Sequence, residues 1–110
     1  MSLSVNLTAK AKRDVRIILS YIQKRSRRGA EAWYRRWLEV LERLAETAPD
    51  FGIAAEDEDH EVTIRQAVFK TRRGLPYRAL FIVREEKVFV LHVRGPGQAD
   101  VAPDNMEFPS

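Results

Sequence analysis

Two apolar runs in the last third of this 110-residue chain constrain its fold more than any other feature. Residues 77–83 and 88–93 are both rich in valine, isoleucine, leucine and phenylalanine, and four charged residues, 84–87, separate them. Apolar runs of this length with many β-branched and aromatic residues are typical of strands. Because the link is so short, we expect the two strands to pair antiparallel.

The preceding segment adds a third strand. Residues 62–70 have an extended pattern, and residues 71–76, Thr-Arg-Arg-Gly-Leu-Pro, provide turn-forming chemistry before the next strand. Three strands with short links predict an antiparallel meander. One face of it must be covered to bury Phe69, Phe81 and Phe89.

Helical periodicity in the first half of the chain provides that cover. Apolar residues recur at helical spacing from Ala9 onward, at Ala11, Val15, Ile18, Leu19 and Ile22, with Thr8 as a candidate N-cap. The pattern breaks over residues 24–29 and resumes from Ala30 to Ala48, before Pro49. The sequence therefore predicts an antiparallel helical hairpin on the sheet, preceded by a short strand at residues 4–7. The fold class is α+β.

Trp33 and Trp37 lie four residues apart on the second helix. Exposed aromatic rings can stack unpaired bases, but these two fall in an apolar stripe with Ala30, Val40, Leu41 and Leu44. We interpret them as core residues.

Length and composition exclude several classes of protein. A chain of this length fits one domain, residues 1–110, with a core of about residues 4–98 and a loosely ordered tail. The absence of cysteine excludes disulfides and thiolate catalysis, and zinc would need His60, His92 and carboxylates alone, so we expect no metal and no other cofactor. The first residues lack the basic-then-apolar pattern of a signal peptide, and no apolar run approaches the roughly 20 residues that a membrane-spanning helix needs. We expect a cytoplasmic protein without membrane contact.

Charge is distributed in blocks. The formal net charge is only +3, yet residues 10–43 carry +7, residues 44–61 carry −7 and residues 62–98 carry +6. Two basic blocks indicate a positive face for an anionic partner, either nucleic acid or an acidic peptide. The alternative is that these charges only maintain solubility.

Most common enzyme motifs are missing, because the chain has no Gly-rich phosphate loop, no nucleophile elbow and no histidine pair at ligand spacing. A set of cations on or beside the strands remains. It comprises Arg65, Lys70, Arg72, Arg73, Arg78, Arg84 and Arg94, with His92 two residues before Arg94. An unpaired cation in a strand is costly, which makes Arg78 and Arg94 the strongest candidates for a functional role.

These residue types suit cleavage of RNA without a metal. The ribose 2′-oxygen attacks the adjoining phosphate, so a protein must accept one proton, donate another and stabilise charge on phosphorus. Arg78 and Arg94 could hold phosphate oxygens, His92 could act as acid or base, and Lys70 could act electrostatically. Arg65, Arg72 and Arg73 would bind RNA phosphates.

Structural roles are the alternative for each candidate. His92 could be a partly buried strand residue bonded to its neighbours. Arg78 could pair with the acidic loop, Glu31 or Glu39. Arg72 and Arg73 flank a turn and could simply be solvated.

The order of predicted elements resembles the RelE/ParE superfamily of toxins. The resemblance covers about residues 4–98 and includes Asp14, Ile18 and Tyr21-Ile22, Ala32-Trp33, residues 77–81 (Tyr-Arg-Ala-Leu-Phe) and residues 90–94 (Val-Leu-His-Val-Arg). It implies a toxin of a type II toxin–antitoxin, or plasmid stabilisation, module. Its partner would be a cognate antitoxin, with a homodimer or a hetero-oligomer as possible assemblies.

The resemblance implies two activities. RelE-like members cleave mRNA on the ribosome, and ParE-like members inhibit DNA gyrase. The arginines of the family's middle and last strands correspond to Arg78 and Arg94, and basic residues before the turn correspond to the region of Lys70, Arg72 and Arg73. Many ribosome-dependent members carry a tyrosine or histidine soon after the last strand, whereas this chain has Gly-Pro-Gly-Gln-Ala-Asp at residues 95–100. The sequence slightly favours a ribonuclease, with gyrase inhibition or a degenerate toxin that only binds antitoxin or RNA as alternatives.

Overall fold

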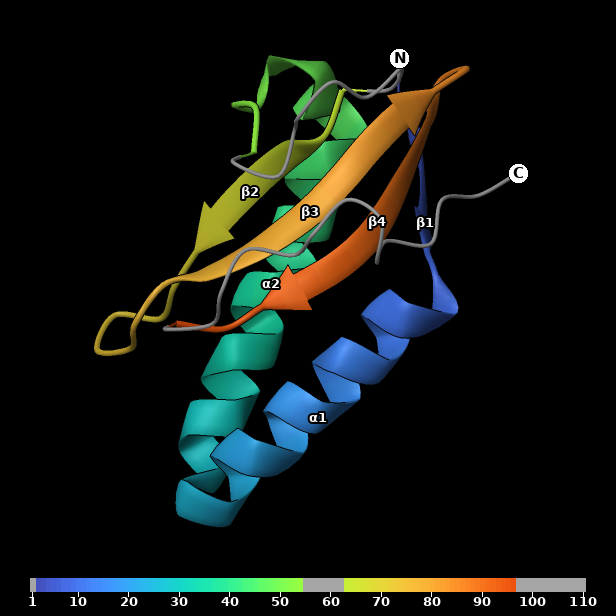
Figure 1. Ribbon diagram of the computed structural model, residues 1–110. Helices are drawn as coiled ribbons and strands as arrows, with labels where there is room; N and C mark the ends of the chain where they lie inside the picture. Colours follow the sequence, from blue (N-terminus) through green and yellow to red (C-terminus); the bar gives the residue numbers. More distant parts are fainter. Residues whose placement is uncertain (1, 55–62, 97–110) are drawn as a thin grey trace.

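The computed structural model describes residues 2–54 and 63–96, which form two helices and a four-stranded sheet (Figure 1). The elements are β1 (Ser4–Leu7), α1 (Ala9–Arg25), α2 (Arg27–Thr47), a short 3₁₀ helix (Ala48–Asp50), β2 (Arg65–Phe69), β3 (Tyr77–Arg84) and β4 (Lys87–Arg94). This arrangement confirms the predicted α+β fold with its helical hairpin and antiparallel meander. The acidic run 56–59, His60 and the tail from residue 97 lie outside the described residues.

The strands are arranged in the order β1-β4-β3-β2. β2 with β3 and β3 with β4 form the antiparallel meander, whereas β1 pairs parallel with the first half of β4, from Ser4 opposite Lys87 to Leu7 opposite Val90. The sequence predicted β1 but did not identify its partner strand. The connection between the two parallel strands runs through the helical hairpin, β2 and β3, in keeping with the long crossover that a parallel pair requires.

The break between the helices is shorter than predicted. Only Ser26 separates α1 from α2, instead of the whole stretch 24–29. Lysine and arginine are good helix formers, so the cations on both sides of Ser26 continue the helices. The Ser26 side chain accepts a hydrogen bond of 2.9 Å from the Gly29 N–H and caps α2, and Thr8 caps α1 in the same way, as predicted.

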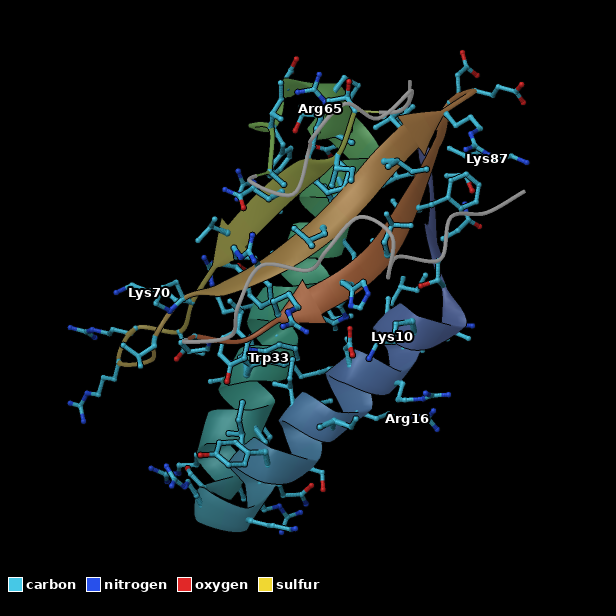
Figure 2. The ribbon with its side chains drawn as sticks, viewed as in Figure 1. Lys10, Arg16, Trp33, Arg65, Lys70 and Lys87 are labelled. Atoms are coloured by element: carbon cyan, nitrogen blue, oxygen red, sulfur yellow. The ribbon has the colours of Figure 1, made fainter. Side chains whose placement is uncertain are left out.

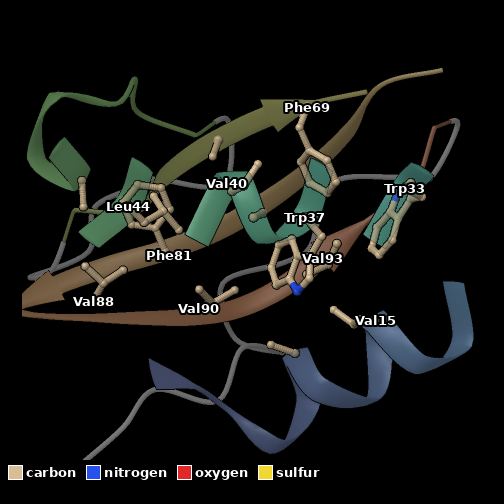
Figure 3. Packing of buried hydrophobic residues seen from close by; sticks show 14 residues of the cluster. Val15, Trp33, Trp37, Val40, Leu44, Phe69, Phe81, Val88, Val90 and Val93 are labelled. Carbon is tan, nitrogen blue, oxygen red and sulfur yellow. The ribbon is translucent and has the colours of Figure 1, made fainter. Parts of the chain in front are cut away.

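The main core lies between the hairpin and one face of the sheet (Figure 3). Trp33 and Trp37 are each only 2% exposed and stack at 6.1 Å between ring centroids, which confirms their core interpretation. Phe69 and Phe81 are buried in the same cluster. Phe89 corrects the prediction: it lies opposite Ile82 and packs on the other face, because Val88 and Val90 take the helix side.

The second face of the sheet carries a smaller apolar cluster. Its members are Ala54, Ile64, Leu80, Ile82 and Leu91, with Phe89 packed against them. Leu91 stands at a register shift, because Phe81 pairs with Val90 while Leu80 pairs with His92. The extra residue interrupts the alternation of side chains, so that Leu91 and the next residue, His92, both lie near this face of β4.

Candidate functional site

Arg78 and Arg94 lie directly opposite each other on β3 and β4. Both side chains are partly buried, and both belong to the face of the sheet away from the helices, since their neighbours Ala79 and Val93 are in the helix-facing core. The Arg78 guanidinium donates a 3.2 Å hydrogen bond from Nη1 to Oε1 of Gln66 on β2. Two fixed positive charges thus lie side by side across two strands.

The cations of the β2–β3 turn lie at the same end of the sheet as Arg78 and Arg94. β2 and β4 end there and β3 begins, so Lys70, Arg72 and Arg73 on the β2–β3 turn are close in the fold to the strand ends that carry Arg78 and Arg94. All three turn side chains are exposed. Figure 2 shows Lys70 at this turn, with further nitrogen-tipped side chains extending from it. This end of the sheet has the charge to receive an anionic surface.

Arg65 lies apart from the other cations. It pairs with Phe81 on the helix-facing side of the sheet, and its Nη1 donates a 2.6 Å hydrogen bond to the carbonyl oxygen of Phe51. The sheet therefore separates Arg65 from Arg78. Glu31 and Glu39 form ion pairs on their own helix, with Arg27 and Arg36, instead of the pairing with Arg78 considered from the sequence.

His92 is buried, with 5% of its surface exposed. Its Nδ1 lies 3.3 Å from Oδ2 of Asp14 on α1, and the same oxygen accepts a 3.0 Å hydrogen bond from the Val93 N–H. The other carboxylate oxygen, Oδ1, is 3.0 Å from Lys10 Nζ. The imidazole is enclosed rather than offered to a substrate, yet it differs from the structural alternative considered above, because neither ring nitrogen has a hydrogen-bond partner among the described residues.

Asp14 completes the edge of β4. β1 covers β4 only as far as Val90, and beyond that point α1 takes over: the Thr8 hydroxyl donates to the Leu91 carbonyl at 3.2 Å, and Asp14 accepts from Val93. Figure 2 shows Lys10 on the part of α1 beside β4. An edge N–H that would otherwise be buried without a partner is thereby satisfied.

Burial alone would raise the pKa of Asp14, but the contact with His92, the Val93 amide and the Lys10 ammonium together hold the pKa below its ordinary value of 3.8. The carboxylate is therefore charged at neutral pH.

Sequence reasoning missed the role of Asp14. The signal was present: Asp14 is the only acid of α1 and lies three residues after Ala11, on the apolar stripe of an otherwise basic helix. An acid in that position needs a buried partner, and the bond to Val93 provides it.

Within residues 2–54 and 63–96, no group of three or more histidine, cysteine, aspartate or glutamate side chains could hold a metal ion. The described helices include none with the length and apolar character needed to cross a membrane.

Comparison with known proteins gives one match. The profile of a family described as the ParE toxin of the type II toxin–antitoxin system, parDE, matches residues 5–99. The chain belongs to the ParE toxin family. The match begins at Val5 in β1 and covers both helices and the other three strands, and therefore includes Asp14, Arg78, His92 and Arg94. Neither the curated proteins nor the solved structures gave a significant match.

Membership of this family identifies the protein as a toxin of a type II system, and such a toxin has an antitoxin as its partner. The expected RelE/ParE-type toxin is thus confirmed, while the match does not choose between cleavage of RNA and inhibition of gyrase.

Proposed function

We propose that this ParE-family toxin arrests growth by binding its target rather than by cutting RNA. DNA gyrase is the target that the ParE-like resemblance implies. Because gyrase acts in the cytoplasm, the toxin would act there too.

The burial of His92 carries this proposal. A general acid or base must reach the proton it transfers, within hydrogen-bond distance of the substrate. His92 is the only histidine in the described part of the chain, and it is enclosed against Asp14. Arg78 and Arg94 can bind anionic groups, but arginine stays protonated and does not exchange protons at neutral pH. Binding without chemistry suits this set of groups better.

Metal-independent cleavage of mRNA is the second candidate, and one observation favours it. The cross-strand pair of Arg78 and Arg94, with the exposed Lys70 at the adjacent turn, could hold a phosphate and stabilise its extra charge. In this alternative Arg72 and Arg73 bind neighbouring phosphates.

Induced expression without an antitoxin tests the two candidates. Growth, mRNA integrity and plasmid supercoiling are followed in the same cultures for the wild type, Arg78→Ala and Arg94→Ala. The proposal expects arrest with intact mRNA and impaired supercoiling, and weaker arrest in the two variants. Arrest with cleaved mRNA would overturn it in favour of the ribonuclease, and no arrest would leave a degenerate toxin that retains only binding to antitoxin or RNA.

Two further variants sharpen the comparison. Arg84→Ala removes a partly buried arginine from the opposite end of β3 and should leave arrest unchanged. His92→Gln keeps a polar group beside Asp14, so binding predicts that a folded variant remains toxic. If the wild type cleaves mRNA while folded His92→Gln neither cleaves mRNA nor arrests growth, the result would point to catalysis by His92.

A further inference from the structure

A second surface of the toxin lies on the helix-facing side of the sheet, opposite to the face that carries the paired arginines, in a groove of about 590 Å³ between the helical hairpin and the end of the sheet. One wall comes from the C-terminal half of α1 and the start of α2, and the other from the β2–β3 turn and the residues after β4. The lining is mainly aliphatic and aromatic, and it includes Ile17, Ile22, Tyr21, Trp33, Leu75 and Tyr77.

The rim of this groove exposes large apolar side chains. Ile17 is 58% exposed, Tyr21 56% and Leu75 67%, and they come from two separate elements. Single exposed apolar residues are common on protein surfaces, but several around one concave site indicate an interaction surface. They stay exposed in the part of the fold that the structure describes.

Packed aromatic rings form the back of the groove. Trp33 and Tyr77 meet edge to face at 5.4 Å between ring centroids, and Trp33 is almost fully buried. Burial and, to a smaller extent, the nearby Tyr21 raise the pKa of Tyr77, so its phenol stays neutral. On the β2–β3 turn, Gly74 packs against Thr71, where an added Cβ would lie 2.4 Å from the Thr71 hydroxyl oxygen. A preformed wall of this kind favours binding, because little order has to be created.

Cations flank the groove on both sides. The junction of α1 and α2 carries four of them, Lys24, Arg25, Arg27 and Arg28, and the β2–β3 turn carries Lys70, Arg72 and Arg73. All seven are exposed, and among the described residues the only acidic side chain within ion-pair distance of them is Glu31, 3.9 Å from Arg27. Arg25 also lies over the ring of Tyr21, with Cζ 5.1 Å from the ring centroid. The surface thus combines an apolar centre with a basic border in which, among the described residues, Arg27 alone has an acidic partner.

We propose that this groove is a second surface through which the toxin binds its target protein, and that it receives an acidic segment of that protein that inserts large apolar side chains. Charge complementarity selects this occupant, since basic borders attract acidic partners and the apolar floor buries their anchors. The inference rests on the proposed function in one respect, namely that the toxin must bind a target protein in order to act.

A protein segment fits the groove better than a nucleic acid does. Binding of unpaired bases needs accessible aromatic faces. Here Trp33 is buried, one face of Tyr21 is covered by Arg25, and aliphatic side chains form most of the remaining wall. Aliphatic walls pack well against leucine, isoleucine or phenylalanine from a partner.

Two double variants test the apolar and the charged part of the groove. Tyr21→Ser with Leu75→Ser removes two exposed apolar groups, and Arg72→Glu with Arg73→Glu reverses one basic border. Each is expressed without an antitoxin, and each purified toxin is titrated into a gyrase supercoiling assay. We expect at least a tenfold higher toxin concentration for half inhibition, and loss of growth arrest.

Matched controls come from another surface of the hairpin. Tyr34→Ser with Leu38→Ser removes the same residue types at exposed positions of α2, and Arg13→Glu with Arg16→Glu makes the same charge change on α1. These controls should retain inhibition and arrest. Urea unfolding of all four proteins checks that the folded state is intact.

The outcomes separate this inference from the proposed function. If the wild type impairs supercoiling and the groove variants do so equally well, the groove inference is wrong while gyrase inhibition stands. Groove variants that remain toxic but escape neutralisation by the antitoxin would also overturn the inference, because the groove would then serve only the antitoxin. If arrest comes with cleaved mRNA and folded groove variants still lose it, gyrase inhibition is wrong and the groove remains the target-binding surface.

Discussion

At the residue scale, Asp14→Asn removes a charge while keeping the size of the side chain. Asp14 is buried and its carboxylate serves the Val93 N–H, His92 and Lys10 at once. The asparagine amide has only one acceptor oxygen, so it cannot replace both carboxylate oxygens, and Lys10 loses its counter-charge. We expect the free energy of unfolding at neutral pH to fall by about 2 kcal/mol, the order expected for hydrogen bonds to a buried charged group, as measured by urea denaturation.

Asp50→Asn is the matched control, because Asp50 is exposed in the short 3₁₀ helix. A surface substitution of this kind should change stability by less than about 0.5 kcal/mol. Equal stability of the two variants would show that the Asp14 carboxylate contributes nothing to closing the edge of β4.

The same residue predicts a dependence of stability on pH. Because the pKa of Asp14 is lower in the folded protein than its ordinary value of 3.8, the unfolded chain takes up this proton first as the pH falls. The stabilisation is therefore complete well above pH 3.8, decreases through that value and is lost below the folded-state pKa. The stability difference between wild type and Asp14→Asn should shrink accordingly when urea denaturation is repeated below pH 3.8. A difference that grows on acidification would contradict this assignment.

At the scale of elements, the β3–β4 turn offers a stabilising change. Glu85 and Glu86 both have positive φ, 50° and 64°, which suits glycine or asparagine and costs other residues about 1 kcal/mol each. Glu85→Asn with Glu86→Gly should raise the free energy of unfolding by about 1 kcal/mol, measured with urea. Glu85→Gln with Glu86→Gln removes the same charges without easing the backbone. If it stabilises equally, the gain is electrostatic.

Elements that depend on local sequence could be predicted from it. The strand at residues 4–7, the Thr8 cap and the two strands around residues 84–87 follow from short-range patterns that the structure confirms. The break between the helices was harder to locate. Lys24 and Arg28 interrupt the apolar pattern, but both are good helix formers, so the helices continue through them and only Ser26 lies between the two. Parallel pairing of β1 with β4 joins residues more than 80 positions apart, and no local pattern encodes such a contact.

The candidate site also combines features that local sequence predicts with one that it does not. Arg78 lies opposite Arg94 because β3 and β4 form one hairpin, and Arg65 lies on the side shared with Ala67 and Phe69 because strand side chains alternate. The enclosure of His92 could not be predicted from its own strand, since it depends on how α1 packs along the edge of β4.

At the scale of the whole molecule, four aromatic rings connect the hairpin to the sheet. Trp33 and Trp37 of α2 pack on Phe69 of β2, with the Trp37 ring centroid 5.7 Å from that of Phe69, and Trp33 also meets Tyr77 of β3. Since this cluster is part of the core between the two layers, its loss should affect the entire fold rather than one element.

Trp37→Ala should therefore reduce toxicity through stability, without any contact between Trp37 and the target. Truncating a buried tryptophan costs about 3–5 kcal/mol, a large part of the roughly 5–15 kcal/mol that stabilises a domain. We expect a much lower urea midpoint and weaker growth arrest. Tyr34→Ala, an exposed position on the same helix, should change the midpoint little. If Trp37→Ala lost toxicity at a wild-type midpoint, Trp37 would instead act at the target surface, because global stability would no longer explain the loss.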